Sequence, residues 1–140
     1  MTGPNATIAA LQGALAAEHA AVYGYGIVGA MLAGAAQSDA RTDWTAHQVA
    51  RDTVVTMLTK LGATPVAASP AYKLPFAVTG TESAARLAAV LENGVTRAYL
   101  GLVAVSDPAL RTFAAQEMQA CASRALAWSG TTIAFPGMPT

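Results

Sequence analysis

The sequence predicts an all-α protein, a four-helix bundle with one long crossover between its second and third helices. Apolar residues recur three and four positions apart in four long segments, which places them on one face of a helix. Hydrophobic residues make up 54% of the chain, and the commonest of them is alanine, the strongest helix former. No stretch alternates apolar and polar residues as a strand would. We therefore expect residues 1–140 to form a single helical domain with one core.

The first helix is predicted from Ala6 or Thr7 to about Gln37, with Asn5 or Thr7 as its N-terminal cap. A short polar side chain at the cap accepts hydrogen bonds from the free N–H groups of the first turn. A helix of about 30 residues spans about 45 Å, because each residue adds 1.5 Å. Four glycines weaken its second half and indicate close contact with another helix or a bend. They are Gly24, Gly26, Gly29 and Gly34.

The second helix is predicted after a short polar break at residues 38–42. We expect it to begin at Thr42 or Asp43 and to end at Leu61, because Gly62 is a good helix terminator. Its seam has heptad-like spacing. The seam residues are Trp44, His47, Arg51, Val54, Leu58 and Leu61. A short break between two such helices makes them antiparallel neighbours.

Residues 62–80 are predicted to form an irregular crossover. Three prolines exclude a regular helix here, because proline lacks the N–H that a helix interior needs. They are Pro65, Pro70 and Pro75. We expect Tyr72, Leu74 and Phe76 to anchor the crossover to the bundle, since an ordered connection of this length is uncommon without a structural or functional reason.

The third helix is predicted from Thr81 to about Val105, and the fourth from Pro108 to about Trp128. Asp107 is suited to cap the fourth helix, and proline is favoured at the first helical position that follows. Residues 130–140 are expected to be coil. Two apolar residues in this coil, Ile133 and Phe135, are candidate anchors. The order of long helices, short turns and one long crossover is that of ferritin-like bundles.

The charge pattern excludes several classes of function. Eight basic and eight acidic residues give no net charge, and no run of Lys or Arg offers the basic footprint that binds nucleic acid. A neutral chain is not drawn to anionic membranes, and we expect no membrane span and no leader peptide. The lone Cys121 cannot form an intrachain disulfide, which fits a cytoplasmic protein.

Six charged or titratable side chains occupy positions where the helical pattern calls for apolar ones. An unpaired buried charge costs several kcal/mol, so we expect these groups to meet along the bundle axis and neutralise one another. This predicted central charged network comprises Glu18, His47, Arg51, Glu92, Glu117 and Arg124. Alternatives stay open: Glu18 could be a partly exposed residue beside the seam, and His47 a satisfied core histidine. On the third helix, an apolar stripe through Leu87 and Leu91 competes with the face of Glu92 for the buried side.

A di-iron carboxylate bundle needs one Glu from each of two helices and a Glu-x-x-His from each of the other two. Glu18 and Glu92 suit the first pair of positions. The second helix offers His47 but has Trp44 where its glutamate should stand, and Ala120 stands where the fourth helix needs a histidine after Glu117. Arginines compete with metals for carboxylates, so we interpret Arg51 and Arg124 as replacing the charge of the metals. The sequence accordingly predicts no metal site, no cofactor and no catalytic residue.

Four segments resemble an uncharacterised ferritin-like family common in actinobacteria. They are LQGALAAEHAAVYGYGIVGAML, HQVARD, AYKLPF and AFPGMP, and the resemblance covers nearly the whole chain. It implies a ferritin-like four-helix bundle but no particular activity, because fold alone does not define a reaction. Of the di-iron ligand positions, the resemblance carries over only Glu18, His47, Glu92 and Glu117.

Three functions follow as hypotheses. The first is a metal-free binding or interaction module that forms a homodimer. The second is a metal-binding, di-iron-type oxidoreductase remnant that uses Glu18, His47, Glu92 and Glu117. The third is a pocket for a small molecule between the helices, covered by residues 62–80. Whether the chain is an enzyme stays open, because no catalytic motif is complete.

Overall fold

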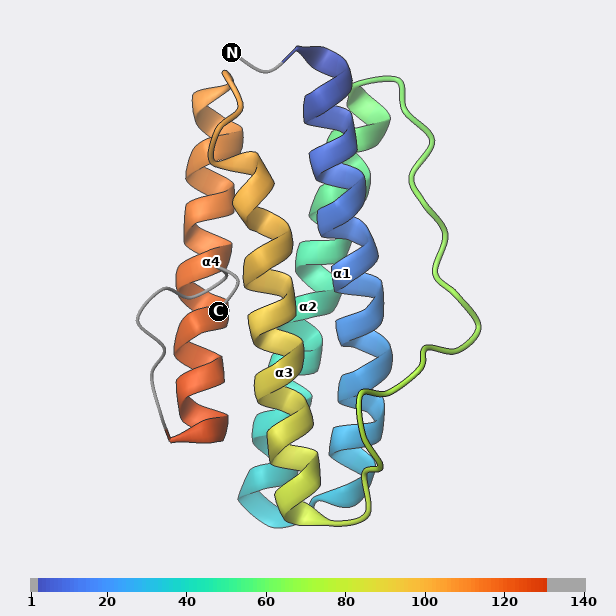
Figure 1. The fold of residues 1–140 in the computed structure, drawn as a ribbon, viewed down its shortest axis with the longest axis vertical. Coiled ribbons are helices and arrows are strands. Elements are labelled where there is room, and N and C mark those ends of the chain that lie inside the picture. The colour runs from blue at the N-terminus through green and yellow to red at the C-terminus, as the bar shows by residue number, and fades with distance from the viewer. Residues whose placement is uncertain (1–2, 131–140) are drawn as a thin grey trace.

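A computed structural model describes residues 3–130 of the chain, and within this range every regular element is helical (Figure 1). The predicted four-helix bundle with a long crossover between the second and third helices is confirmed. The elements are α1 (Pro4–Met31), α2 (Gly34–Lys60), α3 (Thr81–Tyr99), the 3-10 turn η1 (Leu100–Leu102) and α4 (Pro108–Ser129). None of the helices described is long and apolar enough to cross a membrane.

The four helices do not pack equally against one another. The backbones of α1 and α2, of α3 and α4, and of α1 and α3 approach closely along their length, whereas those of α2 and α4 lie farther apart within the described residues. Two apolar clusters form the core, one built around Leu11, Leu15 and Leu58, and the other around Val28 and Leu87. The bundle is therefore packed most closely along three of its four seams and is more open along the seam between α2 and α4.

The first turn lies earlier in the chain than the sequence indicated. The prediction that the first helix reaches Gln37 was wrong: α1 ends at Met31, and residues 38–42 belong to α2. Gly34 adopts a φ of +59°, a left-handed conformation that glycine reaches without strain. The side chain of Gln37 donates to the carbonyl of Gly29 at 2.9 Å and so caps the end of α1. The polar residues at 38–42 mark exposed helix surface and not a break.

The crossover after α2 is irregular, as predicted, and runs along α1 on the side away from α4 (Figure 1). Gln12 holds it by two hydrogen bonds, donating to the carbonyl of Thr64 at 2.7 Å and accepting from the backbone N–H of Val66 at 2.8 Å. The rings of Tyr72 and Tyr23 lie 5.4 Å apart. Leu74 and Phe76, also expected as anchors, pack against the second apolar cluster.

The second hairpin follows the predicted turn closely. The α-helical part of α3 stops at Tyr99, six residues before the expected Val105, and η1 continues the chain as a tighter turn. Asp107 caps α4 as predicted, accepting from the backbone N–H of Ala109 at 2.8 Å. Gly130 ends α4 with a φ of +70°. The expected anchors Ile133 and Phe135 lie outside the described residues.

Candidate functional site

Three ionisable side chains meet in the middle of the bundle with no exposure to solvent. Glu18 comes from α1, His47 from α2 and Glu92 from α3, and each is 0% exposed. The Nδ1 atom of His47 lies 2.6 Å from Oε2 of Glu18, and its Nε2 atom lies 2.8 Å from Oε1 of Glu92. Ionised carboxylates only accept hydrogen bonds, so a ring with a proton on each nitrogen satisfies both of them at once, in line with the raised pKa of His47. The imidazolium of His47 therefore bridges two carboxylates.

Helical periodicity brings these three groups to the centre. Glu18 follows Leu11, Ala14 and Leu15 along the buried face of α1. On α2, the buried positions next to His47 include Ala50 and Val54. Glu92 shares its buried face on α3 with Ala88, Val95 and Tyr99. The competing stripe of α3, through Leu87, is buried as well, since the hydrophobic face of α3 is broad enough to hold both.

Two buried tyrosines complete the carboxylate contacts, and sequence reasoning did not assign them to the site. The hydroxyl of Tyr25 donates to Oε1 of Glu92 at 2.7 Å, and that of Tyr99 donates to Oε1 of Glu18 at 2.9 Å. Each tyrosine lies seven residues after a glutamate on its own helix, two turns along the same face. The bonds cross between antiparallel helices, so α1 and α3 each supply one glutamate and one tyrosine. That seven-residue spacing was the signal in the sequence.

Arg124 brings the second positive charge, from α4. Its Nε atom donates to Oε1 of Glu92 at 2.9 Å, and its Nη2 atom donates to the sulfur of Cys121 at 3.4 Å. The side chain of Arg124 is 18% exposed, so it lies between the core and the open seam. Three donors converge on Oε1 of Glu92, whereas the buried Oε2 has no hydrogen-bond partner among the described residues.

The structure places two of the six predicted network residues differently. Arg51 pairs with its exposed neighbour Asp52 at 2.9 Å, and no hydrogen bond or ion pair among residues 3–130 joins it to the buried groups, so the structure does not bring it into the predicted network. The reason is the helical register, because the buried stripe of α2 continues from His47 to Ala50. Glu117 is half-buried and has no hydrogen bond within the described residues. It interacts with the buried groups only through the electrostatic effect of its charge.

The pKa values of the buried groups follow from these contacts. Burial alone would lower the pKa of His47, but the hydrogen bonds to Glu18 and Glu92 raise it to about 9. Burial opposes ionisation of Glu92, yet the hydrogen bond and charge of His47, followed by Arg124, hold its pKa below the ordinary value. Burial and then the charge of Glu18 raise the pKa of Glu117. At neutral pH the centre therefore pairs a cationic His47 with an anionic Glu92.

The donor set does not fit a di-iron centre. Both nitrogens of His47 are hydrogen-bonded to carboxylates, so neither has a free lone pair for a metal. The guanidinium of Arg124 donates a hydrogen bond to Oε1 of Glu92, the same oxygen that bonds to Tyr25 and His47. No group of three or more His, Cys, Asp or Glu side chains within residues 3–130 is arranged to hold an ion. The orphaned Oε2 of Glu92 is a single oxygen and does not complete a coordination shell.

A groove along the open seam reaches the edge of this network. It encloses about 390 Å³ between the N-terminal half of α2 and the C-terminal half of α4. Its lining residues are Asp39, Thr42, Asp43, Ser123, Arg124, Ala127 and Trp128. The indole of Trp128 donates to Oδ2 of Asp43 at 2.8 Å and so links the two helices. Solvent thus approaches the buried charges from the side of Arg124.

The fold and the site define a four-helix bundle whose central carboxylates are neutralised by protein cations. The chain belongs to the family described as Domain of unknown function (DUF4439), whose sequence profile matches residues 10–140. It is similar to a conserved hypothetical protein of Mycobacterium tuberculosis, rv2844, known from a crystal structure. The two are 35% identical with a TM-score of 0.89, over 92% of this chain and 98% of the other. A comparison with curated proteins finds no match. The predicted resemblance to an uncharacterised family is confirmed.

Proposed function

We propose that this chain is a metal-free, ferritin-like bundle that serves as a binding or interaction module. The observation that carries the proposal is the position of His47, which bonds to Glu18 at 2.6 Å and to Glu92 at 2.8 Å. His47 and Arg124 supply two positive charges to two buried carboxylates. The centre is electrically balanced by the protein itself, so folding requires no metal.

The alternative is a metal-binding, di-iron-type oxidoreductase remnant that uses Glu18, His47, Glu92 and Glu117. Loading a metal there would require His47 to lose its proton and at least one of its carboxylate bonds. Arg124 would then lie beside a metal cation, where like charges repel. The geometry therefore favours the metal-free module, and no residue is proposed to be catalytic.

Metal analysis separates the two functions. The chain is expressed in medium supplemented with iron and zinc, dialysed and analysed for bound metals. We expect far less than one equivalent per chain, and a thermal midpoint that neither Fe²⁺, Zn²⁺ nor a chelator changes, since a ligand stabilises only the state that binds it. A full equivalent of metal that is lost in Glu92→Gln and retained in Glu82→Gln, a change at an exposed residue of the same helix, would overturn the proposal.

We further propose that the module is a homodimer. The exposed surface of α1 carries small residues that allow a second helix to approach closely, namely Ala9, Gly13 and Ala16, which lie apart from the cleft residues of this helix. Close helix packing of this kind favours small side chains. Light scattering at high micromolar concentration should give the mass of two chains, and a monomer mass at that concentration would refute the dimer.

The proposed location of the module is the cytoplasm. Its only cysteine, Cys121, is buried and free, and burial raises the pKa of the thiol, which keeps it protonated. Nothing in the fold therefore depends on an oxidising compartment. Fractionation of the native host cell should recover the chain with cytoplasmic markers, and recovery with secreted proteins would contradict this.

A further inference from the structure

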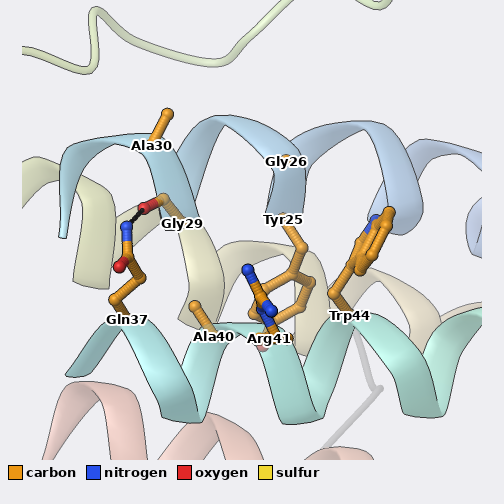
Figure 2. A pocket seen from close by; sticks show the side chains of 8 residues that line it. All are labelled: Tyr25, Gly26, Gly29, Ala30, Gln37, Ala40, Arg41 and Trp44. Carbon is orange, nitrogen blue, oxygen red and sulfur yellow. Dashed lines mark hydrogen bonds between the residues drawn. The ribbon is translucent and has the colours of Figure 1, made fainter. Parts of the chain in front are cut away.

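A second cleft lies between α1 and α2, beside the turn that joins them (Figure 2). It encloses about 280 Å³, just below the range of about 300–1,000 Å³ that is typical of sites that hold small molecules. Its lining residues are Tyr25, Gly26, Gly29, Ala30, Gln37, Ala40, Arg41 and Trp44. None of them belongs to the crossover, so the cleft is distinct from the pocket that the sequence placed under residues 62–80.

Two glycines in this cleft are not explained by packing. A Cβ atom on Gly24 would lie 2.5 Å from Cδ1 of Leu91, so close contact with α3 accounts for that glycine. A Cβ on Gly26 or Gly29 would meet nothing within 4 Å. Glycine is among the least favourable residues inside a helix, so its presence where a larger side chain fits has a stability cost. The consequence is an empty space on α1 that faces α2.

The opposite wall is a row of three polar or aromatic side chains from α2. Gln37, Arg41 and Trp44 are spaced so that they share one helical face, and they stand toward α1 (Figure 2). The outer two are fixed, because Gln37 donates to the carbonyl of Gly29 at 2.9 Å and Trp44 donates to that of Val22 at 3.1 Å. The guanidinium of Arg41, between them, has no ion-pair partner among residues 3–130.

The chemistry of the lining specifies a class of ligand. Trp44 offers aromatic surface to a planar, apolar body. Arg41 offers paired N–H donors whose geometry matches a carboxylate, and no acidic side chain lines the cleft to neutralise it. The same positive charge disfavours an amine or a metal cation. The volume fits a molecule of one or two rings.

We propose that the cleft between α1 and α2 binds a small aromatic carboxylate, with the carboxylate on Arg41 and the ring over Gly26 and Gly29 against Trp44. This inference rests on the binding half of the proposed function and names its ligand class. Tyr25 lines the cleft from the buried side, and its hydroxyl lies 2.7 Å from Glu92, so the cleft adjoins the buried network.

Benzoate is the test probe, with benzamide as its uncharged counterpart. Calorimetric titration of the full chain should give benzoate binding at least about tenfold tighter than benzamide binding, as one charge-assisted hydrogen bond supplies. Benzoate should shift the amide NMR signals of Gly26 and Gly29. Arg41→Gln, a change at an exposed side chain, should abolish the preference for benzoate.

A substitution that fills the cleft provides a second test. Gly29→Leu should weaken benzoate binding at least about tenfold while leaving the thermal midpoint equal or higher, because leucine favours helix more than glycine does. Gly94→Leu is the matched control, since Gly94 lies exposed within α3, has open space beside it and does not line the cleft. It should leave benzoate binding unchanged.

Three results would overturn the inference: no benzoate binding at millimolar concentration, benzoate binding that Gly29→Leu does not weaken, or equal binding of benzamide. If Gly29→Leu fails to fold, Arg41→Gln still decides. The metal analysis is independent of these titrations. If benzoate does not bind, the proposal of a metal-free module is unaffected. If a metal is bound, that proposal is overturned whatever the titrations show.

Discussion

The pH dependence of stability should report directly on the protonated bridge formed by His47. Its pKa is raised from the ordinary value of 6.5 to about 9 by the hydrogen bonds to Glu18 and Glu92, against the effect of burial. Because the folded chain binds the His47 proton more tightly than the unfolded chain does, the proton stabilises the fold. This stabilisation is fully present below pH 6.5, where both states hold the proton. That stability is lost as the pH rises toward 9, because only the folded chain still binds the proton.

The size of the effect follows from the same two values. A difference between 6.5 and about 9 corresponds to about 3 kcal/mol, at about 1.4 kcal/mol for each pH unit. The free energy of unfolding should fall by about this amount between pH 6.5 and 9. Cys121, on the neighbouring α4, adds a change of the same sign only at the upper end of the range, because burial raises the pKa of its thiol.

Urea unfolding followed by circular dichroism, repeated at intervals across this pH range, measures the fall. His47→Gln should flatten the curve, while His19→Gln, which removes the other histidine from the surface of α1, should retain the fall. The contribution of Cys121 is common to both variants and cancels in the comparison. NMR titration of the His47 ring in the unmodified chain reports its pKa even if His47→Gln does not fold.

The reasoning would be refuted by a free energy of unfolding that stays constant from pH 6.5 to 9. It would also fail if the His47 ring titrated near its ordinary value of 6.5. Either result would mean that the carboxylates do not hold a proton on both ring nitrogens. The interpretation of the centre as a cation between two anions would then have to be abandoned.

Two further substitutions test how the charges are divided between core and surface. Arg124→Ala should lower the free energy of unfolding by about 3 kcal/mol, because it leaves the buried Glu92 with one cation fewer. Arg51→Ala, the matched loss of an arginine, should change it by less than about 1 kcal/mol, and equal effects in urea unfolding would contradict the assignment. Glu117→Gln should be neutral or stabilising at pH 7, because burial and Glu18 disfavour the Glu117 carboxylate. A loss well above 0.5 kcal/mol would reveal a partner for Glu117 that the structure lacks.

Sequence reasoning predicted helices well where apolar spacing and capping agreed. The start of α4 illustrates this, because Asp107 and Pro108 each specify the first turn by a separate mechanism. The turn between α1 and α2 was misplaced because the polar residues at 38–42 suggest a loop when read alone. What decides the turn is Gly34, the residue with a positive φ, and the sequence held three further glycines nearby that fitted equally well.

The sequence did not show which of two adjacent residues on α2, Ala50 or Arg51, faces the core. His47 and Arg51 are four residues apart, a spacing that suits one face, yet the buried stripe moves on to Ala50. A helix turns 100° per residue, so only the packing of all four helices decides which of two adjacent positions is buried. The tyrosines were overlooked because an aromatic residue on an apolar face is accounted for by packing alone. Their hydroxyl groups gain a role only once a carboxylate is placed opposite.

The crossed bonds between α1 and α3 tie the two helices together in one register. Tyr25 reaches Glu92 while Tyr99 reaches Glu18, so the two antiparallel helices hold each other at two points. A slip of α3 along α1 by one turn, about 5.4 Å, would break both bonds together and withdraw Glu92 from His47. Alanine-rich faces offer little shape to resist such a slip, because their small side chains interdigitate weakly. The polar layer therefore supplies the register that the apolar surface of this chain cannot define alone.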